Sequence, residues 1–316
     1  MKQLFIFSFI ILLIAACTQK EKTQQDYSIA YNVFAPDSVA PDNYEIFITD
    51  LDGSNKKNLT RNKDVAWTYY AFQDKIFFVS DRDTAYRNLF LYEMDADGNN
   101  IKRVSDLRLE DSWMSSRNNG QELVVTGRIG KEIRYQLFIV NTKTGAYKQI
   151  TNDTAAYHSD PCFSPDGKQI VFAYQKNKRD RSSHEELFIM NADGTGMKQI
   201  TNYPEDNVSV NDHGYKAGAP KWHPTDNFIT YISKRDNRYN IYAVAPDGSK
   251  QWKLTESKDN EGWHDWSSDG KWLVYDSANE SGSQYHIMLM NWQTKQVKQI
   301  TDTTYKYQQA PVFVKN

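Results

Sequence analysis

The chain has few cysteines, no strong excess of charge of one sign, and only one long apolar run. Two cysteines among 316 residues exclude a small fold held together by disulfides. The 38 basic and 40 acidic side chains nearly cancel, so neither nucleic acid nor an anionic surface is expected as a partner. The apolar run at residues 4–16 is too short to span a bilayer comfortably and too close to the start to belong to a core.

Motifs of common catalytic and calcium-binding classes are also missing. No G-x-S-x-G segment occurs, which excludes an attached serine hydrolase of the α/β type. Two Asp-x-Asp-Gly runs begin at Asp50 and Asp95, but the twelfth place of a helix–loop–helix calcium site holds Arg61 and Asp106 instead of a glutamate. We interpret both runs as tight turns between strands.

The first residues determine the expected location. Residues 14–17 read Ile-Ala-Ala-Cys and resemble the lipobox of bacterial lipoproteins, in which the cysteine is acylated. The resemblance implies a signal peptide at residues 1–16, then a lipidated Cys17 and a flexible tether at residues 17–26. It places the protein in the cell envelope, anchored to a membrane by lipid. Thr18 favours the outer membrane, on its periplasmic or its surface side, and Cys162 would then be a lone, buried thiol.

Six related segments recur along the chain, each with an apolar strand, a polar turn and a second strand that ends in a hydroxyl residue. The closing residues are 45, 46, 50, 54 and 46 positions apart. A period of about 40–50 residues made only of strands is typical of a β-propeller. The closing residues are Thr60, Ser105, Thr151, Thr201, Thr255 and Thr301.

The fourth repeat shows most clearly how one blade is built. An inner strand ends at Phe163, a Ser-Pro-Asp-Gly turn follows, and three more strands come before Thr201. The first repeat lacks an inner strand, whereas residues 310–313 match the inner strand at residues 219–222. We therefore predict an all-β, six-bladed propeller of four-stranded blades at residues 27–316. The C-terminal strand is expected to close the ring by completing the first blade.

The sequence FSPDGK of the fourth repeat, followed by QIVFAY and LFIMNADGTGMKQIT, resembles the Pro-Asp repeat of TolB-type propellers. The resemblance covers nearly all of residues 27–316 and implies the propeller fold. It implies less about function, because such blades occur in the Tol-system component, in prolyl-oligopeptidase-type enzymes and in pectin-fragment lyases. Nine residues separate Cys17 from Tyr27, so the N-terminal α/β domain of the Tol component is expected to be absent.

The leading hypothesis is a non-catalytic, monomeric envelope lipoprotein that needs no cofactor. It would bind a protein, a peptide or a peptidoglycan-associated partner at one mouth of the propeller channel. Asp64, Asp111 and Asp160 are aligned at one repeat position at this mouth, which would give a rim that is half acidic. The other three repeats carry Ala219, Trp263 and Ala310 there.

Two long loops extend this expected rim. Residues 202–218 join the fourth repeat to the fifth and contain His213, Tyr215 and Lys216. Residues 175–185 form a basic loop between two strands of the fourth repeat. Long loops on a rigid scaffold often carry binding specificity, so both are candidate contact segments.

One alternative is a metal-assisted polysaccharide lyase or a related glycan enzyme. By resemblance to the pectin-fragment lyases, His158, His213 and His264 would share a divalent metal in the channel, with Lys216 or Arg61 as the proton acceptor. This reading would make a divalent metal the cofactor.

Another alternative is a glycan-binding accessory protein. Trp263, Tyr215 and Tyr305 would then supply flat aromatic faces on which sugar rings stack. The sequence leaves the choice between these classes open.

Overall fold

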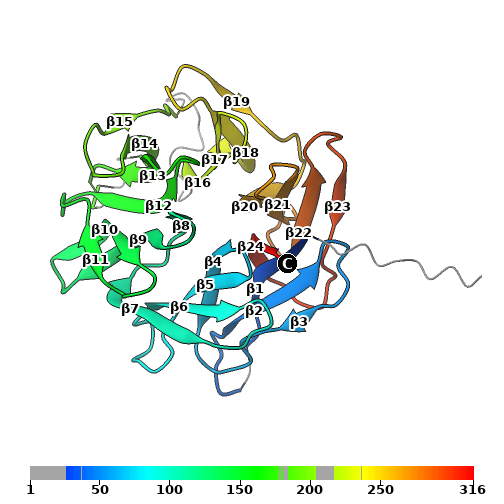
Figure 1. The fold of residues 1–316 in the computed structure, drawn as a ribbon. Coiled ribbons are helices and arrows are strands. Elements are labelled where there is room, and N and C mark those ends of the chain that lie inside the picture. The colour runs from blue at the N-terminus through cyan, green and yellow to red at the C-terminus, as the bar shows by residue number, and fades with distance from the viewer. Residues whose placement is uncertain (1–25, 37, 178, 181–183, 204–216, 236) are drawn as a thin grey trace, which may run out of the picture.

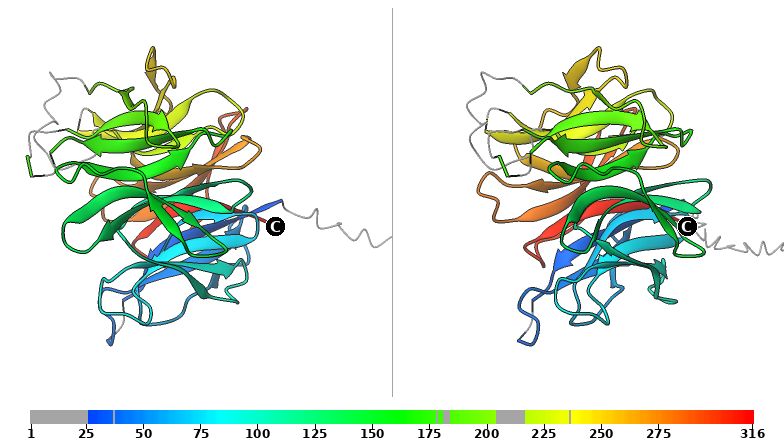
Figure 2. Two further views of the ribbon diagram at one scale, coloured as in Figure 1. Left: turned by 60° about the vertical axis from the view of Figure 1, so that its left-hand side comes forward. Right: turned by 90° about the vertical axis from the view of Figure 1, so that its left-hand side faces the viewer.

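The computed structural model describes residues 26–316 except 37, 178, 181–183, 204–216 and 236. The expected signal peptide and most of the expected tether, including Cys17, therefore lie outside the described residues. All regular structure within them is strand, arranged as sheets around a central axis (Figure 1; side views in Figure 2). The described part of the chain offers no helix with the length and hydropathy needed to cross a bilayer.

Four of the sheets have four strands each. The first contains both chain ends that the structure describes, and the other three follow one another along the second half of the chain. Listed from the axis outward they are β24 (Gln308–Lys315), β1 (Tyr27–Phe34), β2 (Tyr44–Asp50) and β3 (Lys57–Asn58); β12 (Tyr157–Phe163), β13 (Gln169–Gln175), β14 (Glu186–Asn191) and β15 (Lys198–Gln199); β16 (Gly218–Trp222), β17 (Ile229–Arg235), β18 (Arg238–Val244) and β19 (Gln251–Lys253); β20 (Asn260–Trp266), β21 (Trp272–Ala278), β22 (Tyr285–Asn291) and β23 (Val297–Gln299).

A fifth sheet holds eight strands and occupies the place of the second and third repeats. Seven of its strands follow one path, and β8 pairs with β9 beside that path. Its strands are β4 (Ala66–Phe72), β5 (Lys75–Ser80), β6 (Phe90–Asp95), β7 (Lys102–Leu109), β8 (Ser115–Arg117), β9 (Glu122–Ile129), β10 (Ile133–Asn141) and β11 (Tyr147–Gln149).

The prediction of six separate four-stranded blades is therefore wrong. The propeller has four four-stranded blades and one continuous eight-stranded sheet. The two repeats merge at β7, which pairs with β6 on one side and with β9 on the other, where Arg108 lies opposite Arg128 and Leu109 opposite Gly127. The predicted closure is confirmed, because β24 pairs antiparallel with β1 from Tyr27 to Val33 and completes the first sheet.

The closing hydroxyl residue explains where the repeats separate and where they merge. In five repeats the threonine hydroxyl accepts a hydrogen bond from the backbone N–H of the third strand, for example Leu187 N to Thr201 Oγ1 at 2.8 Å. The outer strand of such a repeat ends shortly before its threonine. Ser105 instead donates its hydroxyl to the carbonyl of Gly145 at 2.7 Å, and β7 runs on through it to Leu109. The other four pairs are Ile46 with Thr60, Leu137 with Thr151, Ile241 with Thr255 and Ile287 with Thr301.

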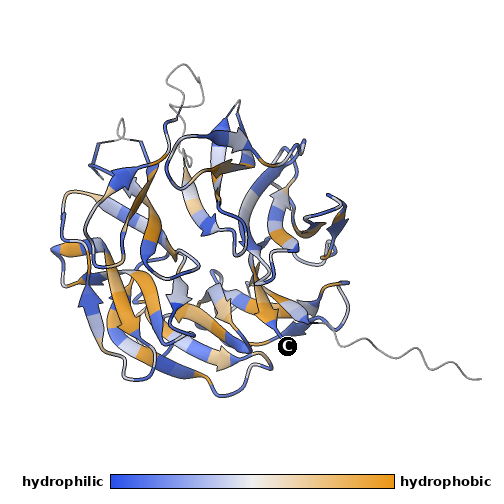
Figure 3. Ribbon diagram, turned by 45° about the horizontal axis from the view of Figure 1, so that its top comes forward, coloured by the Kyte–Doolittle hydropathy of each residue, from blue (hydrophilic) through white to orange (hydrophobic). Residues whose placement is uncertain are grey.

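The core lies between neighbouring sheets, where buried aliphatic and aromatic side chains pack together. Hydrophobic residues recur along the strands of every sheet (Figure 3). Val171 and Leu187 of one blade pack with Tyr231 and Val244 of the next, and all four are buried. Because each sheet is covered on both faces, its central strands are apolar over most of their length.

The strands nearest the axis are β24, β4, β8, β12, β16 and β20, and we name them the inner strands (Figure 1). The end of the channel where these strands begin is called the upper mouth below. The end where they finish, at Phe72, Arg117, Phe163, Trp222, Trp266 and Lys315, is called the lower mouth. Five inner strands, β4, β12, β16, β20 and β24, contain an irregular register in which an extra residue is inserted, as at Ser159/Cys162 in β12.

Replacing Thr301 by valine tests the role of the closing threonine. The hydroxyl of Thr301 is buried and accepts the N–H of Ile287 at 2.9 Å, so valine leaves that N–H without a partner. We expect the free energy of unfolding to fall by about 1–3 kcal/mol in denaturant titrations. Thr303→Val, at an exposed position, is the matched control and should have little effect. Equal stability of both variants would contradict this role.

Candidate functional site

Asp160 ties three segments together at the upper mouth. It lies in the irregular part of β12 with a φ of 53° and is buried. One carboxylate oxygen accepts hydrogen bonds from the Ser112 hydroxyl and the Trp113 N–H, both at 3.0 Å, and the other accepts the Ala219 N–H of the next blade at 3.3 Å. Burial raises the pKa of this carboxyl, and the three hydrogen bonds oppose that shift. Asp160 is therefore a link between sheets.

The prediction that Asp64, Asp111 and Asp160 share one repeat position is wrong. Cys162 and Ser115 hold equivalent positions in the pairing of their inner strands with the next strand. Cys162 lies two residues after Asp160, whereas Ser115 lies four residues after Asp111, so the two aspartates are not equivalent. Asp64 precedes β4 altogether. The inner strands differ in length and in the residues inserted at their irregular positions, so equal sequence spacing does not give equal placement. Ala219 and Ala310 do occupy the place of Asp160, with φ values of 47° and 53°.

Asp111 nevertheless lies at the upper mouth, although it is not equivalent to Asp160. Its side chain is exposed there and accepts a hydrogen bond from the Tyr69 hydroxyl. Desolvation by the surrounding protein raises the pKa of Asp111, the Tyr69 hydrogen bond opposes that shift, and the nearby charge of Asp160 adds to it. Glu185 also lies within electrostatic range of Asp160, and burial raises the pKa of Glu185 to about 7. We call Asp111, Asp160 and Glu185 the acidic group of the upper mouth.

A pocket of about 460 Å³ opens at the same mouth between the sheets of β16–β19 and β20–β23. Trp263 lines it, together with Tyr239, Tyr285 and Gln309. Asp276 also lines it, next to Gly262, where an added Cβ would come within 2.1 Å of the Asp276 Oδ1 atom. Only glycine therefore leaves room for this carboxylate. We call this cavity the upper pocket.

Asp276 is a site residue that the sequence analysis missed. It is buried in β21, and its Oδ2 atom accepts the N–H of Ala310 at 2.8 Å. Desolvation by burial raises the pKa of Asp276 to about 7, against hydrogen bonds from the N–H groups of Ala310 and Trp263. The signal was present in the sequence, because an aspartate inside the apolar run WLVYDSA is unusual for a buried strand.

An arc of half-buried aromatic rings continues from the upper pocket along the mouth. Successive ring centroids are 5.4, 5.8, 5.0 and 5.5 Å apart. The guanidinium carbon of Arg87 lies 4.5 Å from the centroid of the last ring. The rings, which we call the aromatic arc, are Tyr285, Tyr307, Phe34, Tyr44 and Trp67.

The two described histidines of the expected metal site bond to protein groups. His158 is buried, and its Nδ1 atom lies 3.2 Å from the Tyr135 carbonyl oxygen. His264 is buried with Nε2 at 2.8 Å from the Thr230 hydroxyl, and desolvation lowers its pKa to about 3. Among the described residues no three His, Cys, Asp or Glu side chains are grouped closely enough to hold a metal ion. His213, Tyr215 and Lys216 lie outside the described residues, so the three-histidine site stays a prediction.

Tyr305, the remaining predicted aromatic, is half-buried between two sheets. Its ring lies 5.2 Å from that of Phe47 in an edge-on arrangement, and its carbonyl oxygen accepts hydrogen bonds from Gln284 and Gln308. It contributes to packing between the last blade and the first.

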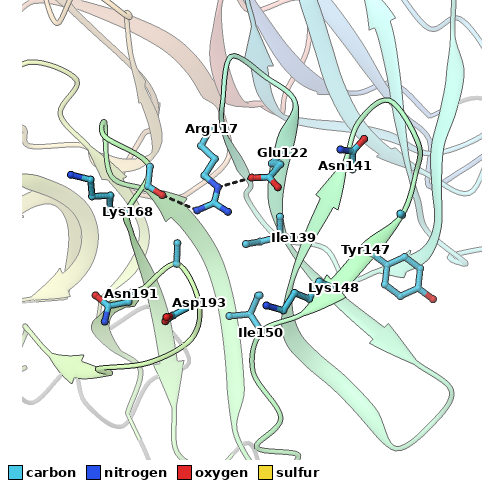
Figure 4. A pocket seen from close by; sticks show the side chains of 13 residues that line it. Arg117, Glu122, Ile139, Asn141, Tyr147, Lys148, Ile150, Lys168, Asn191 and Asp193 are labelled. Carbon is cyan, nitrogen blue, oxygen red and sulfur yellow. Dashed lines mark hydrogen bonds and ion pairs between the residues drawn. The ribbon is translucent and has the colours of Figure 1, made fainter.

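A second cavity, of about 710 Å³, lies between β8–β11 and β12–β15 toward the lower mouth (Figure 4). Arg117 stands at its edge, where its guanidinium donates to Glu122 at 2.7 Å and to the Gly167 carbonyl at 3.0 Å. The same guanidinium lies 4.9 Å from the Phe163 ring centroid. The positive charge of Arg117 is thus already paired, which favours a role in joining two sheets.

Comparison with known proteins shows which proteins share this architecture. A family model described as the TolB β-propeller domain matches residues 68–316. The Tol-Pal system protein TolB of Francisella tularensis subsp. mediasiatica is 29% identical over 225 residues, which cover 67% of this chain and 47% of that protein. Dipeptidyl-peptidase 5 of Porphyromonas endodontalis is 29% identical over 113 residues, which cover 35% of this chain and 15% of that protein.

The crystal structure of TolB from Acinetobacter baumannii superposes with a TM-score of 0.69 at 16% identity, covering 92% of this chain and 67% of that one. The similarity to this structure establishes the fold. The chain spans less than half the length of the two curated relatives above.

Replacing Asp276 by asparagine tests the electrostatics of the upper pocket. A carboxyl group whose pKa is higher in the folded than in the unfolded protein costs stability as the pH rises from about 4 to about 7. We therefore expect the melting temperature of the unmodified protein to fall over this range. The fall should be smaller in Asp276→Asn. The fall that remains would come from other carboxyl groups with a raised pKa, such as Glu185. Parallel pH profiles of the two proteins, measured by calorimetry, would refute the assignment.

Proposed function

The chain belongs to the TolB β-propeller family, and on that premise we propose that it is a binding protein of the bacterial cell envelope. Its partner would be a protein or peptide that docks at the upper mouth. The relatives named as Tol-Pal system components support an envelope role, and the upper mouth supplies the surface on which such a partner could be held.

The single observation that carries the proposal is the aromatic arc beside the acidic group. Aromatic side chains that stay half-exposed are the residues most enriched at protein–protein interfaces, because they bury much apolar area at low cost in side-chain entropy. The five rings from Tyr285 to Trp67 contact one another in succession, and such contacts restrict side-chain rotation and lower that cost further. The upper pocket next to them could receive one side chain of the partner.

The charge of the mouth favours a polypeptide with basic residues. Asp111 lies within electrostatic range of Tyr44 in the aromatic arc, and Glu185 lies near Asp160 at the same mouth. A docked lysine or arginine side chain would favour the ionised form of these carboxyl groups and would bind to it. Peptides provide such cations together with apolar side chains. Neutral and acidic polysaccharides provide no cation, which makes the glycan-binding reading the weaker one.

The proposal includes a lipid anchor at Cys17. Residues 18–26 would span at most about 30 Å when extended, so the anchor would keep the start of β1 near a membrane. Tyr27, the first residue of β1, lines the cavity at the lower mouth. With the lower mouth turned toward the membrane, the upper mouth would face away from it and remain open to a partner.

Site-specific photo-crosslinking in cells tests the docking surface. A photoreactive phenylalanine analogue at Tyr307 or at Tyr44 should give a defined crosslinked protein in the envelope fraction. The control is the same analogue at Tyr147, an exposed residue of β11 on the outside of the ring. Adding Asp111→Lys to the Tyr307 version should reduce the crosslink severalfold, because the acidic group would lose one carboxylate and gain a cation. A crosslink of equal yield at Tyr147, or none at either upper position, would contradict the proposal.

Replacing Cys17 by serine tests the anchor. A serine cannot carry the thioether-linked lipid, so Cys17→Ser should abolish incorporation of labelled fatty acid and should reduce the share of protein that stays with washed membranes at high salt. Cys162→Ser is the matched control and should leave both unchanged. Labelling of the Cys17→Ser protein at the unmodified level would overturn this part of the proposal.

A further inference from the structure

The lower mouth contains a cavity of about 580 Å³ on the channel axis. The ends of the inner strands surround it, so residues from all five sheets line it. Seven aromatic side chains are among its lining residues: Tyr27, Tyr70, Phe72, Phe163, Trp222, Trp266 and Phe313. A flat apolar group would therefore find stacking partners on several sides.

A buried ion pair lies in the wall of this cavity. The Lys221 ammonium group is 3.5 Å from the Asp265 Oδ1 atom, and the Lys221 side chain is only 6% exposed. The ammonium also lies 3.9 Å from the centroid of the Trp113 ring. Both Lys221 and Asp265 line the cavity. A desolvated charge of this kind is costly unless strong partners compensate it.

Hydrogen bonds from the backbone of one inner strand to a side chain of the preceding one join the sheets at the lower mouth, and these joints do not require the ion pair. At this level Ser115 Oγ accepts the N–H of Phe163 at 2.7 Å, and Cys162 accepts the N–H of Trp222. Asp265 accepts the N–H of Phe313 at 3.0 Å. Lys221 lies at the equivalent position, but a lysine ammonium accepts no hydrogen bond. The N–H of Trp266 therefore bonds to the Asp265 carboxylate instead. A neutral side chain at position 221 would serve the ring equally well, so the fold alone does not explain an ammonium group there.

The Lys221 ammonium has donor capacity left for a ligand. It carries three N–H groups, and in the described part of the chain Asp265 is the acceptor found for it, at a distance longer than a normal charged hydrogen bond. The Asp265 carboxylate in turn divides its oxygens between Lys221 and backbone N–H groups. Exposed Lys315 adds a second cation at the edge of the cavity.

We propose that the lower mouth binds a carboxylate attached to an aromatic or similarly flat apolar group, with Lys221 receiving the carboxylate. The aromatic rings hold the flat group, and the ligand competes with Asp265 for the ammonium. Two sources supply this chemistry, a small carboxylic acid that carries an aromatic ring and the carboxyl end of a peptide. The site is separate from the upper mouth and does not depend on the protein partner proposed there.

Titration calorimetry on the full chain in detergent tests the proposal with three probes. N-acetyl-phenylalanine carries the carboxylate, N-acetyl-phenylalaninamide is its neutral match, and a short peptide that ends in phenylalanine represents a polypeptide source. We expect the acid to bind at least tenfold more tightly than the amide, because a hydrogen bond to a charged group is involved. If the peptide binds more tightly than the single residue, the source is a polypeptide end; otherwise it is a small acid. Equal affinity for acid and amide would overturn the proposal.

Two substitutions should change the affinity in opposite directions. Lys221→Met removes the cation and should weaken binding of the acid about ten- to hundredfold. Asp265→Asn keeps an acceptor for the Phe313 N–H but removes the competing charge, so it should tighten binding. Lys234→Met, in the upper pocket, is the matched control and should leave affinity unchanged. A purely structural ion pair predicts instead that both variants lose stability and that Asp265→Asn does not gain affinity.

Cys162 provides an independent readout inside the cavity. Cys162 lines the site, and the residue is 8% exposed. The bound acid should slow alkylation of Cys162, measured by mass spectrometry of the peptide that contains it, whereas the amide should not. If Lys221→Met fails to fold, the comparison of acid with amide and the affinity of the Asp265→Asn variant still test whether the cavity binds a carboxylate. Alkylation that is unaffected by saturating acid would contradict binding in this cavity.

Discussion

Each inner strand has one edge without a neighbouring strand, and the ring depends on how the N–H groups along that edge are satisfied. A buried backbone N–H without a partner costs as much as a lost hydrogen bond, and an open edge invites pairing with other chains. Here a side chain from the adjacent sheet takes the place of the missing strand. Asp160 accepts the N–H of Ala219, Asp276 that of Ala310 and Ser115 that of Phe163. These bonds run across the joints and fix the sheets relative to one another.

The same constraint shapes the upper mouth. Asp160 and Asp276 are acidic because a carboxylate can accept several N–H groups at once, so part of the negative character of the mouth follows from the joints themselves. Asp111 and Glu185 differ, since neither joins two inner strands through a backbone N–H in the described structure. Their carboxyl groups are additional acidic groups at this mouth that a partner's cation could bind. Recognition by charge would therefore depend on these two residues more than on the linking aspartates.

The sequence was sufficient for the features that recur and insufficient for those that vary between repeats. The period, the turns and the closing C-terminal strand follow from local patterns that every copy must satisfy. The merger of two repeats goes with the hydrogen bond of Ser105, which bonds to Gly145 of the following repeat and not to the third strand of its own repeat. In the sequence a serine and a threonine at this position look alike. The misaligned aspartates have a similar cause, because an inserted residue in an inner strand shifts every later position without changing the repeat length. The aromatic arc joins rings from residues 34–67 to rings from residues 285–307, and no local pattern reveals it.

A repeated architecture also offers a way to separate residues that serve the fold from residues that serve a ligand. At three joints of the ring a side chain of one inner strand, Ser115, Cys162 or Asp265, accepts an N–H group of the next inner strand. At the equivalent position of β24, Val312 provides no acceptor and is neutral. Lys221 stands at an equivalent place but cannot accept, and its burial adds a desolvation cost that the neutral Ser115, Cys162 and Val312 avoid. The buried ammonium group of Lys221 is therefore not explained by the joining of the sheets and needs another cause. The cavity beside Lys221, lined with aromatic rings and open at the lower mouth, supplies one, because a carboxylate ligand would use the donor groups that the ring leaves free.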